Sequence, residues 1–207
     1  MKYVYLFLMI SLAFMLACGG NQEQEQTPAA ETAEEIGEEP IEPEKEYTPV
    51  NEFGEWREIS SKEGDFRFMM PGEPYYAVDT VNTPRGPVEY PSYTLDTPEK
   101  HLMIGYSDMP EDLVAQAPER VVLEGAVRGV VEESRGTSVL DTLIQNDSMT
   151  ARESIVTLPD DKSVMRVRAY MSGNRVYIVA ATAPVSDTAG LLGRFVESFE
   201  LLQHGAK

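Results

Sequence analysis

The sequence predicts an α+β protein in which helices pack on a mostly antiparallel β-sheet. Two observations predict this class. Short runs of alternating apolar and polar residues recur from residue 56 onward and are joined by short turns, as in an antiparallel meander. Two stretches with an apolar period of 3.6 residues, one in the middle and one near the end, predict the helices.

The first half of this region predicts strands. Two short alternating runs meet across Lys62-Glu63-Gly64, which is a hairpin signal, and Phe66, Phe68 and Met70 share one face of the second run. Pro91 lies inside a later run and predicts an edge strand or a bulge there, because proline cannot donate to a strand ladder. The expected strands are Trp56–Ser60, Asp65–Met69, Tyr75–Val81, Val88–Leu95 and Leu102–Tyr106.

A helix is expected next, from about Glu119 to Ser134. Leu123, Val127 and Val130 form one apolar stripe at helical spacing. Gly125 and Gly129 also share one face, and each costs about 1 kcal/mol in helix propensity, which suits a face lying close against a sheet. Arg135-Gly136 predicts the end of the helix.

The last part predicts an antiparallel meander of strands followed by a helix. Arg166 and Arg168 alternate with apolar residues, so one face of their strand is expected to meet water. The continuous apolar run 176–181 predicts a central strand covered on both faces. Ser186 or Asp187 can cap the final helix. Its buried stripe is expected to be Leu191, Leu192, Phe195 and Phe199, after strands at Ser138–Ile144, Ala151–Leu158, Ser163–Met171 and Val176–Ala183.

Three segments resemble the PsbP-like α/β/α sandwich: Asp65–Pro74, Gly173–Tyr177 and Arg194–Phe199. Together with the strand and helix order, the resemblance covers about Trp56 to Leu202. These motifs describe turns and core, not chemistry. The resemblance implies the sandwich fold and a binding or assembly module, and no metal-site or partner-contact motif carries over to this chain.

Residues 1–17 resemble the signal peptide of a bacterial lipoprotein. Lys2 precedes an apolar run from Val4 to Ala17, whose 14 residues would make a helix of roughly 21 Å, short of the ~30 Å hydrocarbon core. A cleaved export signal therefore fits better than a spanning helix. The run ends at Cys18 like a lipobox, although Met15 and Leu16 stand where leucine and a small residue are commoner.

The resemblance implies that Cys18 becomes the first mature residue, with diacylglycerol on its sulfur and an acyl chain such as palmitate on its amine. Two or more chains anchor a protein stably. An ordinary secretory signal with an incidental cysteine is the alternative. As the chain's single cysteine, Cys18 excludes a disulfide within a monomer and a thiolate metal cluster. The expected location is the bacterial envelope, with the outer membrane favoured by Gly19 and either a periplasmic or a surface-exposed domain.

Residues 18–50 are expected to be a disordered acidic linker. They contain ten glutamates and one lysine, and too few apolar residues to offset the entropy of ordering. A spacer or a sorting signal would both suit them. Residues 51–207 are expected to form one globular domain, with 25 acidic against 15 basic residues. That balance excludes nucleic acid as a partner and argues against docking of the domain on anionic lipid.

Catalytic patterns are missing from the sequence. Neither His101 nor His204 accompanies a nucleophile elbow, a phosphate loop or a zinc spacing. Asp108, Glu111 and Asp112 form the tightest acidic cluster near a helix start, but they lack the alternating pattern of a calcium loop. Stabilisation of the helix start explains them without a metal. We therefore predict no enzyme, no cofactor and no metal, and keep these three acids only as weak candidate cation ligands.

Tyrosines are the one distribution that suggests a binding surface. Tyr75, Tyr76, Tyr90 and Tyr93 fall near an expected edge strand, where they would suit a partner protein or a glycan. Tyrosine is also a good strand former, so a structural role is the alternative. The preferred hypothesis is a lipid-anchored envelope protein with a non-catalytic domain that binds another envelope protein. A domain that binds a small ligand or a divalent cation is the alternative, and a hydrolytic enzyme is the least favoured.

Overall fold

The computed structural model describes residues 48–83, 86–146 and 149–202. The predicted leader, Cys18, nearly all of the acidic linker and His204 lie outside the described residues. Within the described ranges, no helix combines the length and apolar character needed to cross a membrane.

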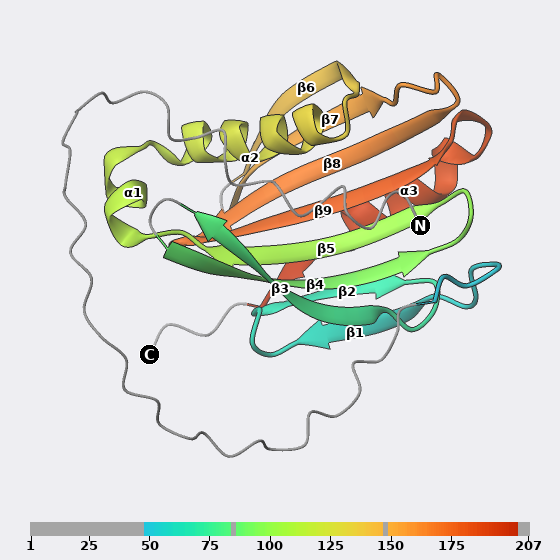
Figure 1. The fold of residues 1–207 in the computed structure, drawn as a ribbon, viewed down its shortest axis with the longest axis horizontal. Coiled ribbons are helices and arrows are strands. Elements are labelled where there is room, and N and C mark those ends of the chain that lie inside the picture. The colour runs from blue at the N-terminus through green and yellow to red at the C-terminus, as the bar shows by residue number, and fades with distance from the viewer. Residues whose placement is uncertain (1–47, 84–85, 147–148, 203–207) are drawn as a thin grey trace, which may run out of the picture.

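A seven-stranded antiparallel sheet forms the centre of the described structure (Figure 1). Its strand order is β3-β4-β5-β9-β8-β7-β6, so β6 to β9 form the predicted meander and β9 lies in the interior. The strands are β3 (Tyr75–Thr83), β4 (Gly86–Asp96), β5 (His101–Asp108), β6 (Thr137–Asn146), β7 (Met149–Thr157), β8 (Ser163–Ser172) and β9 (Arg175–Pro184).

A second, three-stranded sheet contains β1 (Arg57–Ser61), β2 (Phe66–Met70) and β10 (Glu200–Leu201). The hairpin of β1 and β2 was expected, but β10 was not, because two residues are too few for a periodic pattern. β10 pairs with β2, which brings the end of the described chain back to its beginning.

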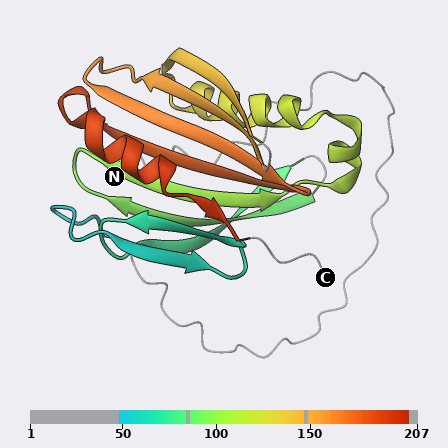
Figure 2. The ribbon, with the colours of Figure 1, turned by 180° about the vertical axis from the view of Figure 1, so that it is seen from behind.

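Both faces of the large sheet are covered, one by a helix and the other by the small sheet together with a second helix. Helix α2 (Glu119–Glu133) crosses one face over β7 and β8 (Figure 1). The small sheet and α3 (Thr188–Glu197) lie on the other face, as the view from behind shows (Figure 2). A short helix, α1 (Glu111–Gln116), precedes α2, and a 3-10 turn, Val185–Asp187, precedes α3. The predicted α+β class is confirmed.

Two hydrophobic clusters fill the two interfaces. The cluster between the sheets and under α3 is rich in aromatic rings, such as Phe66, Tyr177 and Phe199. The cluster under α2 is aliphatic and sulfur-containing, with the predicted stripe of Leu123, Val127 and Val130 buried. Because Val176–Ala181 of β9 is buried throughout, the prediction of a strand covered on both faces is correct.

Two local predictions differ from the structure. β4 as a whole is not an edge strand, because β5 pairs with it from Ser92 onward, although Pro91 lies in the stretch that pairs with β3 alone. The predicted end of α2 is confirmed, since the helix ends at Glu133 and Arg135 takes a left-handed φ of 54° beyond it. Gly136 is needed for close approach, because a Cβ there would lie 2.3 Å from Val156. Asp187 precedes α3 but makes no side-chain capping bond, and its carboxylate pairs with Lys100.

Candidate functional site

An apolar rim lies along the β3 edge of the large sheet. We define the β3 rim as Tyr76, Val78 and Tyr93, which the strand register places on one face. The contacts of Tyr93 with Phe66 and Phe68 of β2 show that this face is turned toward the small sheet. Tyr76 is 42% exposed and Val78 is 48% exposed. The Tyr76 and Tyr93 rings are cross-strand neighbours, with centroids 4.9 Å apart at 47°. The rim therefore offers aromatic and aliphatic area to solvent on an edge strand.

The rim is supported from inside by the aromatic core. The Tyr93 ring meets Phe66 edge-on at 5.9 Å and Phe68 at 5.6 Å. Its hydroxyl donates to Oγ of Ser61 at 3.1 Å, and the same oxygen accepts the backbone N–H of Gly64. Tyr93 thus joins the edge of the large sheet to the hairpin of the small sheet, which limits the freedom of the ring before any partner binds.

A second network ties the same hairpin to the centre of the large sheet. Arg175 holds both carboxylate oxygens of Asp108, at 2.6 and 2.8 Å, and donates to the Glu63 carbonyl at 2.6 Å. Its guanidinium lies 5.0 Å from the ring centroid of Tyr106. The Tyr177 hydroxyl donates to the Gly64 carbonyl at 2.9 Å. Sequence reasoning missed this network because its members lie far apart in the chain.

The electrostatics of these groups leave the phenols neutral at ordinary pH. Burial raises the pKa of Tyr106 to about 12 and also raises the pKa of Tyr76. The hydrogen bonds from Arg175 lower the pKa of Asp108, so that carboxylate stays charged and engaged. The Tyr76 phenol of the β3 rim consequently carries no charge, and the Tyr93 hydroxyl is already bonded to Ser61.

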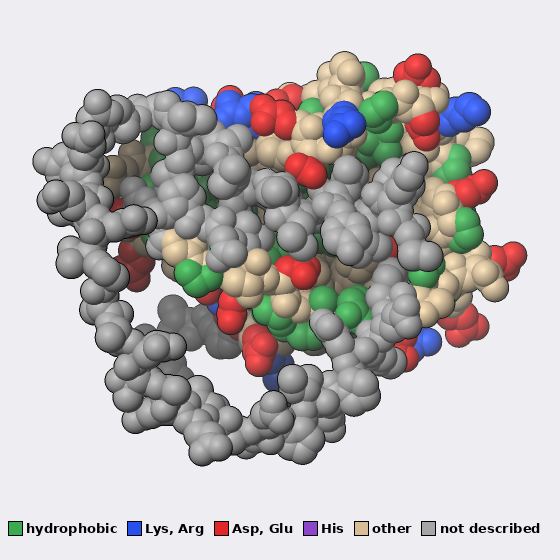
Figure 3. Space-filling view, in the orientation of Figure 1, with side chains coloured by type: hydrophobic (Ala, Val, Ile, Leu, Met, Phe, Trp, Pro, Cys, Tyr) green, Lys and Arg blue, Asp and Glu red, His purple; other side chains and the backbone are tan. Residues whose placement is uncertain are grey.

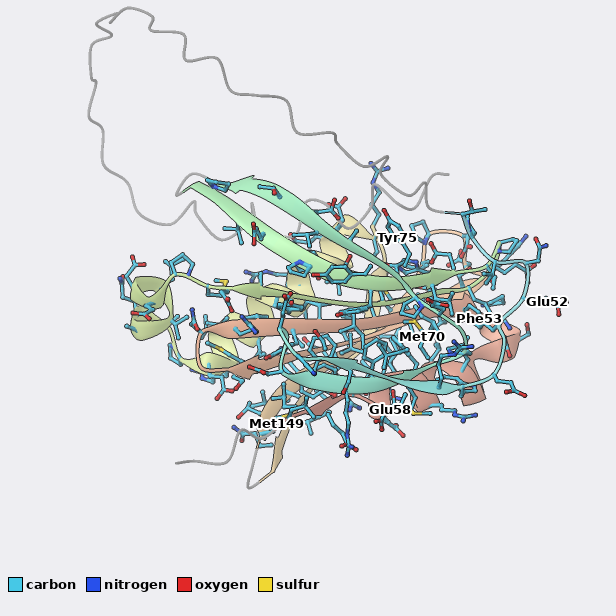
Figure 4. All side chains as sticks on the ribbon, turned by 90° about the horizontal axis from the view of Figure 1, so that it is seen from below. Glu52, Phe53, Glu58, Met70, Tyr75 and Met149 are labelled. Atoms are coloured by element: carbon cyan, nitrogen blue, oxygen red, sulfur yellow. The ribbon has the colours of Figure 1, made fainter. Side chains whose placement is uncertain are left out.

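The four predicted tyrosines do not form one cluster. Tyr75 and Tyr90 share the opposite face of the β3–β4 hairpin from Tyr76 and Tyr93, because consecutive strand residues alternate in direction. In Figure 4, Tyr75 lies above Met70, and Glu58 lies below it. The Tyr90 ring lies over Gly105, where a Cβ would come within 2.4 Å of it, and burial raises the pKa of Tyr90. Tyr90 therefore has a packing role.

An ion network joins β7 and β8 to α3 on the face of the large sheet that α3 covers. Glu153 is buried, and its Oε2 accepts from Nε of Arg168 at 2.6 Å and lies 3.1 Å from Nε of Arg166. Arg166 also reaches Glu197 of α3 at 3.1 Å. The alternation predicted for β8 is present, but its arginine face is only partly exposed to water. Both arginines share one buried carboxylate, which the sequence pattern alone could not show.

The predicted acidic cluster is not assembled as a cation site. Asp108 is bound by Arg175, and Glu111 and Asp112 lie in the first turn of α1. Among the described residues, no group of three or more histidine, cysteine, aspartate or glutamate side chains is placed to hold a metal ion. His101 begins β5 as expected, and its Nδ1 contacts Oδ1 of Asp96.

Charge is dispersed over the visible surface. In the space-filling view, acidic side chains are scattered over the part of the α2 face that is not drawn in grey, and they do not gather in one patch (Figure 3). Basic side chains are interspersed among them. This surface therefore shows no concentrated field that would select a highly charged partner.

The described elements define a PsbP-like α+β fold. The solution structure of cyanobacterial PsbP (CyanoP) from Synechocystis sp. PCC 6803 is similar, with a TM-score of 0.51 and 12% sequence identity. The match covers 77% of this chain and 99% of that one. At this identity the similarity shows the fold alone. No model of a known protein family matches the sequence, and no curated protein sequence matches it.

Proposed function

We propose that this chain is a lipid-anchored protein of the bacterial envelope whose PsbP-like domain is a non-catalytic binding module. In this proposal Cys18 carries the lipid, residues 19–50 act as a tether, and the β3 rim binds another envelope protein. The leader and its cysteine support the anchor, and Gly19 favours the outer membrane. The exposed rim, backed by an ordered aromatic core, is the observation that carries the binding function.

The chemistry of the rim suits a protein partner with an apolar contact. Tyrosine and aliphatic side chains on a rigid support are typical of interface centres, because they bury area at low entropic cost. The hydroxyl of Tyr76 can satisfy a polar group at the margin of such a contact. The partner would therefore present an apolar or aromatic patch to β3, without needing a strong opposite charge.

Site-specific cross-linking tests the binding surface. A photo-reactive amino acid replaces Tyr76 in the full chain, expressed in its native cells, and the matched control carries it at Glu111, which is exposed on α1. We expect the probe at position 76 to give one cross-linked adduct with an envelope protein. The probe at position 111 should give less of that adduct. Val78→Lys should abolish that adduct, and an adduct that survives Val78→Lys would count against the rim.

Two further measurements test the remaining parts of the proposal. Cys18→Ser should release the protein from the membrane fraction, and the mature N-terminus should carry the mass of its acyl chains. A bare N-terminus would remove the anchor but leave the rim untouched. Thermal melts with calcium, manganese or small metabolites test the ligand-binding alternative, since a ligand bound to the native state raises stability. A shift there that Val78→Lys leaves unchanged would favour the alternative.

A further inference from the structure

The turn between β1 and β2 is fixed to the large sheet by two side chains of β9. The Glu63 carbonyl accepts a hydrogen bond of 2.6 Å from Arg175, and the Gly64 carbonyl accepts one of 2.9 Å from the Tyr177 hydroxyl. β9 lies in the interior of the large sheet, between β5 and β8. The position of the turn is therefore set by a strand that is itself held on both sides.

The turn packs without free space at Gly64. A Cβ atom at this position would lie 2.2 Å from the Phe66 ring and 2.9 Å from Oγ of Ser61. Close-packed groups transmit a displacement to their neighbours, because no void is present to absorb it. A shift of the turn would therefore move Ser61, which is 3% exposed.

Ser61 connects the turn to the β3 rim. Its Oγ accepts one hydrogen bond of 3.1 Å from the backbone N–H of Gly64 and another of 3.1 Å from the Tyr93 hydroxyl. The Tyr93 ring in turn lies 4.9 Å from the Tyr76 ring between centroids. The direction of the Tyr93 phenol, and with it the support of Tyr76, consequently depends on where the turn holds Ser61.

We propose that Arg175 is a positioning residue for the β3 rim, an inference that rests on the proposed binding function of the rim. Arg175 holds the turn, the turn holds Ser61, and Ser61 holds Tyr93 in the orientation that meets the partner. The planar guanidinium suits this task because it binds both carboxylate oxygens of Asp108, at 2.6 and 2.8 Å, while it also reaches the Glu63 carbonyl. Asp108 fixes the direction of the fork.

Cross-linking with a matched arginine tests this role. Arg175→Lys keeps the positive charge but loses the planar fork that reaches the Glu63 carbonyl. Arg152→Lys is the control, because Arg152 also binds one carboxylate through two hydrogen bonds, both of 2.8 Å, and its side chain is 20% exposed against 23% for Arg175. Its carboxylate partners, on β6 and α2, lie outside the turn and the rim.

The full chain carries an aromatic photo-reactive amino acid at position 76 and is expressed in its native cells. The yield of the adduct should fall about three-fold in Arg175→Lys, as for the loss of one hydrogen bond, and should be unchanged in Arg152→Lys. Tyr93→Phe removes the hydroxyl that Ser61 orients. Arg175→Lys should therefore cause no further loss of adduct when Tyr93→Phe is already present.

Hydrogen exchange at the Gly64 amide supplies a measurement that needs no partner. We expect this amide to exchange about three times faster in Arg175→Lys and at the parent rate in Arg152→Lys. An unchanged exchange rate in Arg175→Lys would overturn the inference, and so would adduct losses that add in the double variant.

The outcome for the parent chain separates this inference from the proposed function. An adduct from the parent chain whose yield Arg175→Lys leaves unchanged would overturn the role of Arg175 alone, and the rim would stand. If the parent chain gave no adduct, the proposed function would fail, and this inference would fail with it.

Discussion

The two faces of the seven-stranded sheet are buried by side chains of different chemistry. Toward the small sheet and α3 the core contains phenylalanine and tyrosine rings, whereas toward α2 it contains valine, leucine, methionine and alanine. The aromatic side includes hydroxyls that bond to turns, such as that of Tyr177 on the Gly64 carbonyl. The aliphatic side has no such polar tips among its members, so it depends on shape and exclusion of water.

This difference explains where the candidate binding surface lies. Aromatic rings extend from the buried core to the β3 edge through Tyr93 and Tyr76, so the core continues into the surface. The packing of these rings against the core restricts the motion of the Tyr93 and Tyr76 side chains. The aliphatic core is instead closed over by α2, and its stripe is buried. We therefore expect loss of an aromatic residue to affect both stability and binding, and loss of an aliphatic one to affect stability alone.

The largest expected effect is that of Phe66→Ala. Phe66 is fully buried and contacts the rings of five aromatic residues, so its removal should lower the free energy of unfolding by about 3–5 kcal/mol. Val127→Ala in the aliphatic core should cost about 2 kcal/mol, since it removes two methyl groups. Urea denaturation of the full chain measures both. Equal losses would show that the two cores do not differ in this way.

The next effect concerns the ion network beside the aromatic core. Glu153→Gln leaves Arg166 and Arg168 without their shared carboxylate and should cost about 2 kcal/mol, less than a fully buried pair because the arginines are partly exposed. Glu197→Gln is the control, since its side chain is exposed and should contribute less than about 1 kcal/mol. Similar losses from both variants, in the same denaturation assay, would contradict a buried network.

A smaller effect is expected where the Tyr90 ring of β4 lies over Gly105 of β5. Gly105→Ala should cost about 1–2 kcal/mol, because the new methyl group would force the Tyr90 ring to move. The cost should fall to near zero when Tyr90→Ala is already present, and a double-mutant cycle of unfolding free energies measures the difference. A cost independent of Tyr90 would show that the ring is not what excludes a side chain at this position.

The smallest effect appears at alkaline pH. The pKa of Tyr106 is raised to about 12, above the value near 10 of an unfolded tyrosine. The unfolded chain therefore loses this proton first, and the contribution of Tyr106, fully present below about pH 10, is lost between about pH 10 and 12. Tyr106→Phe should flatten the decline of stability in that range. An unchanged slope in the variant would assign the decline to other groups.

Periodicity along the chain predicted most elements well, and its errors have identifiable causes. The strand expected at Ser163–Met171 is observed as β8, Ser163–Ser172. It was predictable because the alternation of apolar and polar residues is a local feature of the sequence. Pro91 predicts an edge only locally, because the missing donor of one residue does not decide how the rest of its strand pairs. In the structure β5 pairs with β4 only beyond that residue. The split of the tyrosines was foreseeable, since Tyr75 and Tyr76 are consecutive strand residues and must point in opposite directions.

By itself the sequence determined the longer strands, the turns between them and the apolar stripe of α2, because these follow from interactions between residues a few positions apart. It also determined the charge balance and the position of the single cysteine. Only the tertiary structure decided which strands are edges, that β10 completes a second sheet, and that Arg175 meets Asp108, 67 residues away. Those pairings depend on closing long loops around two packed cores, and no local pattern encodes that closure.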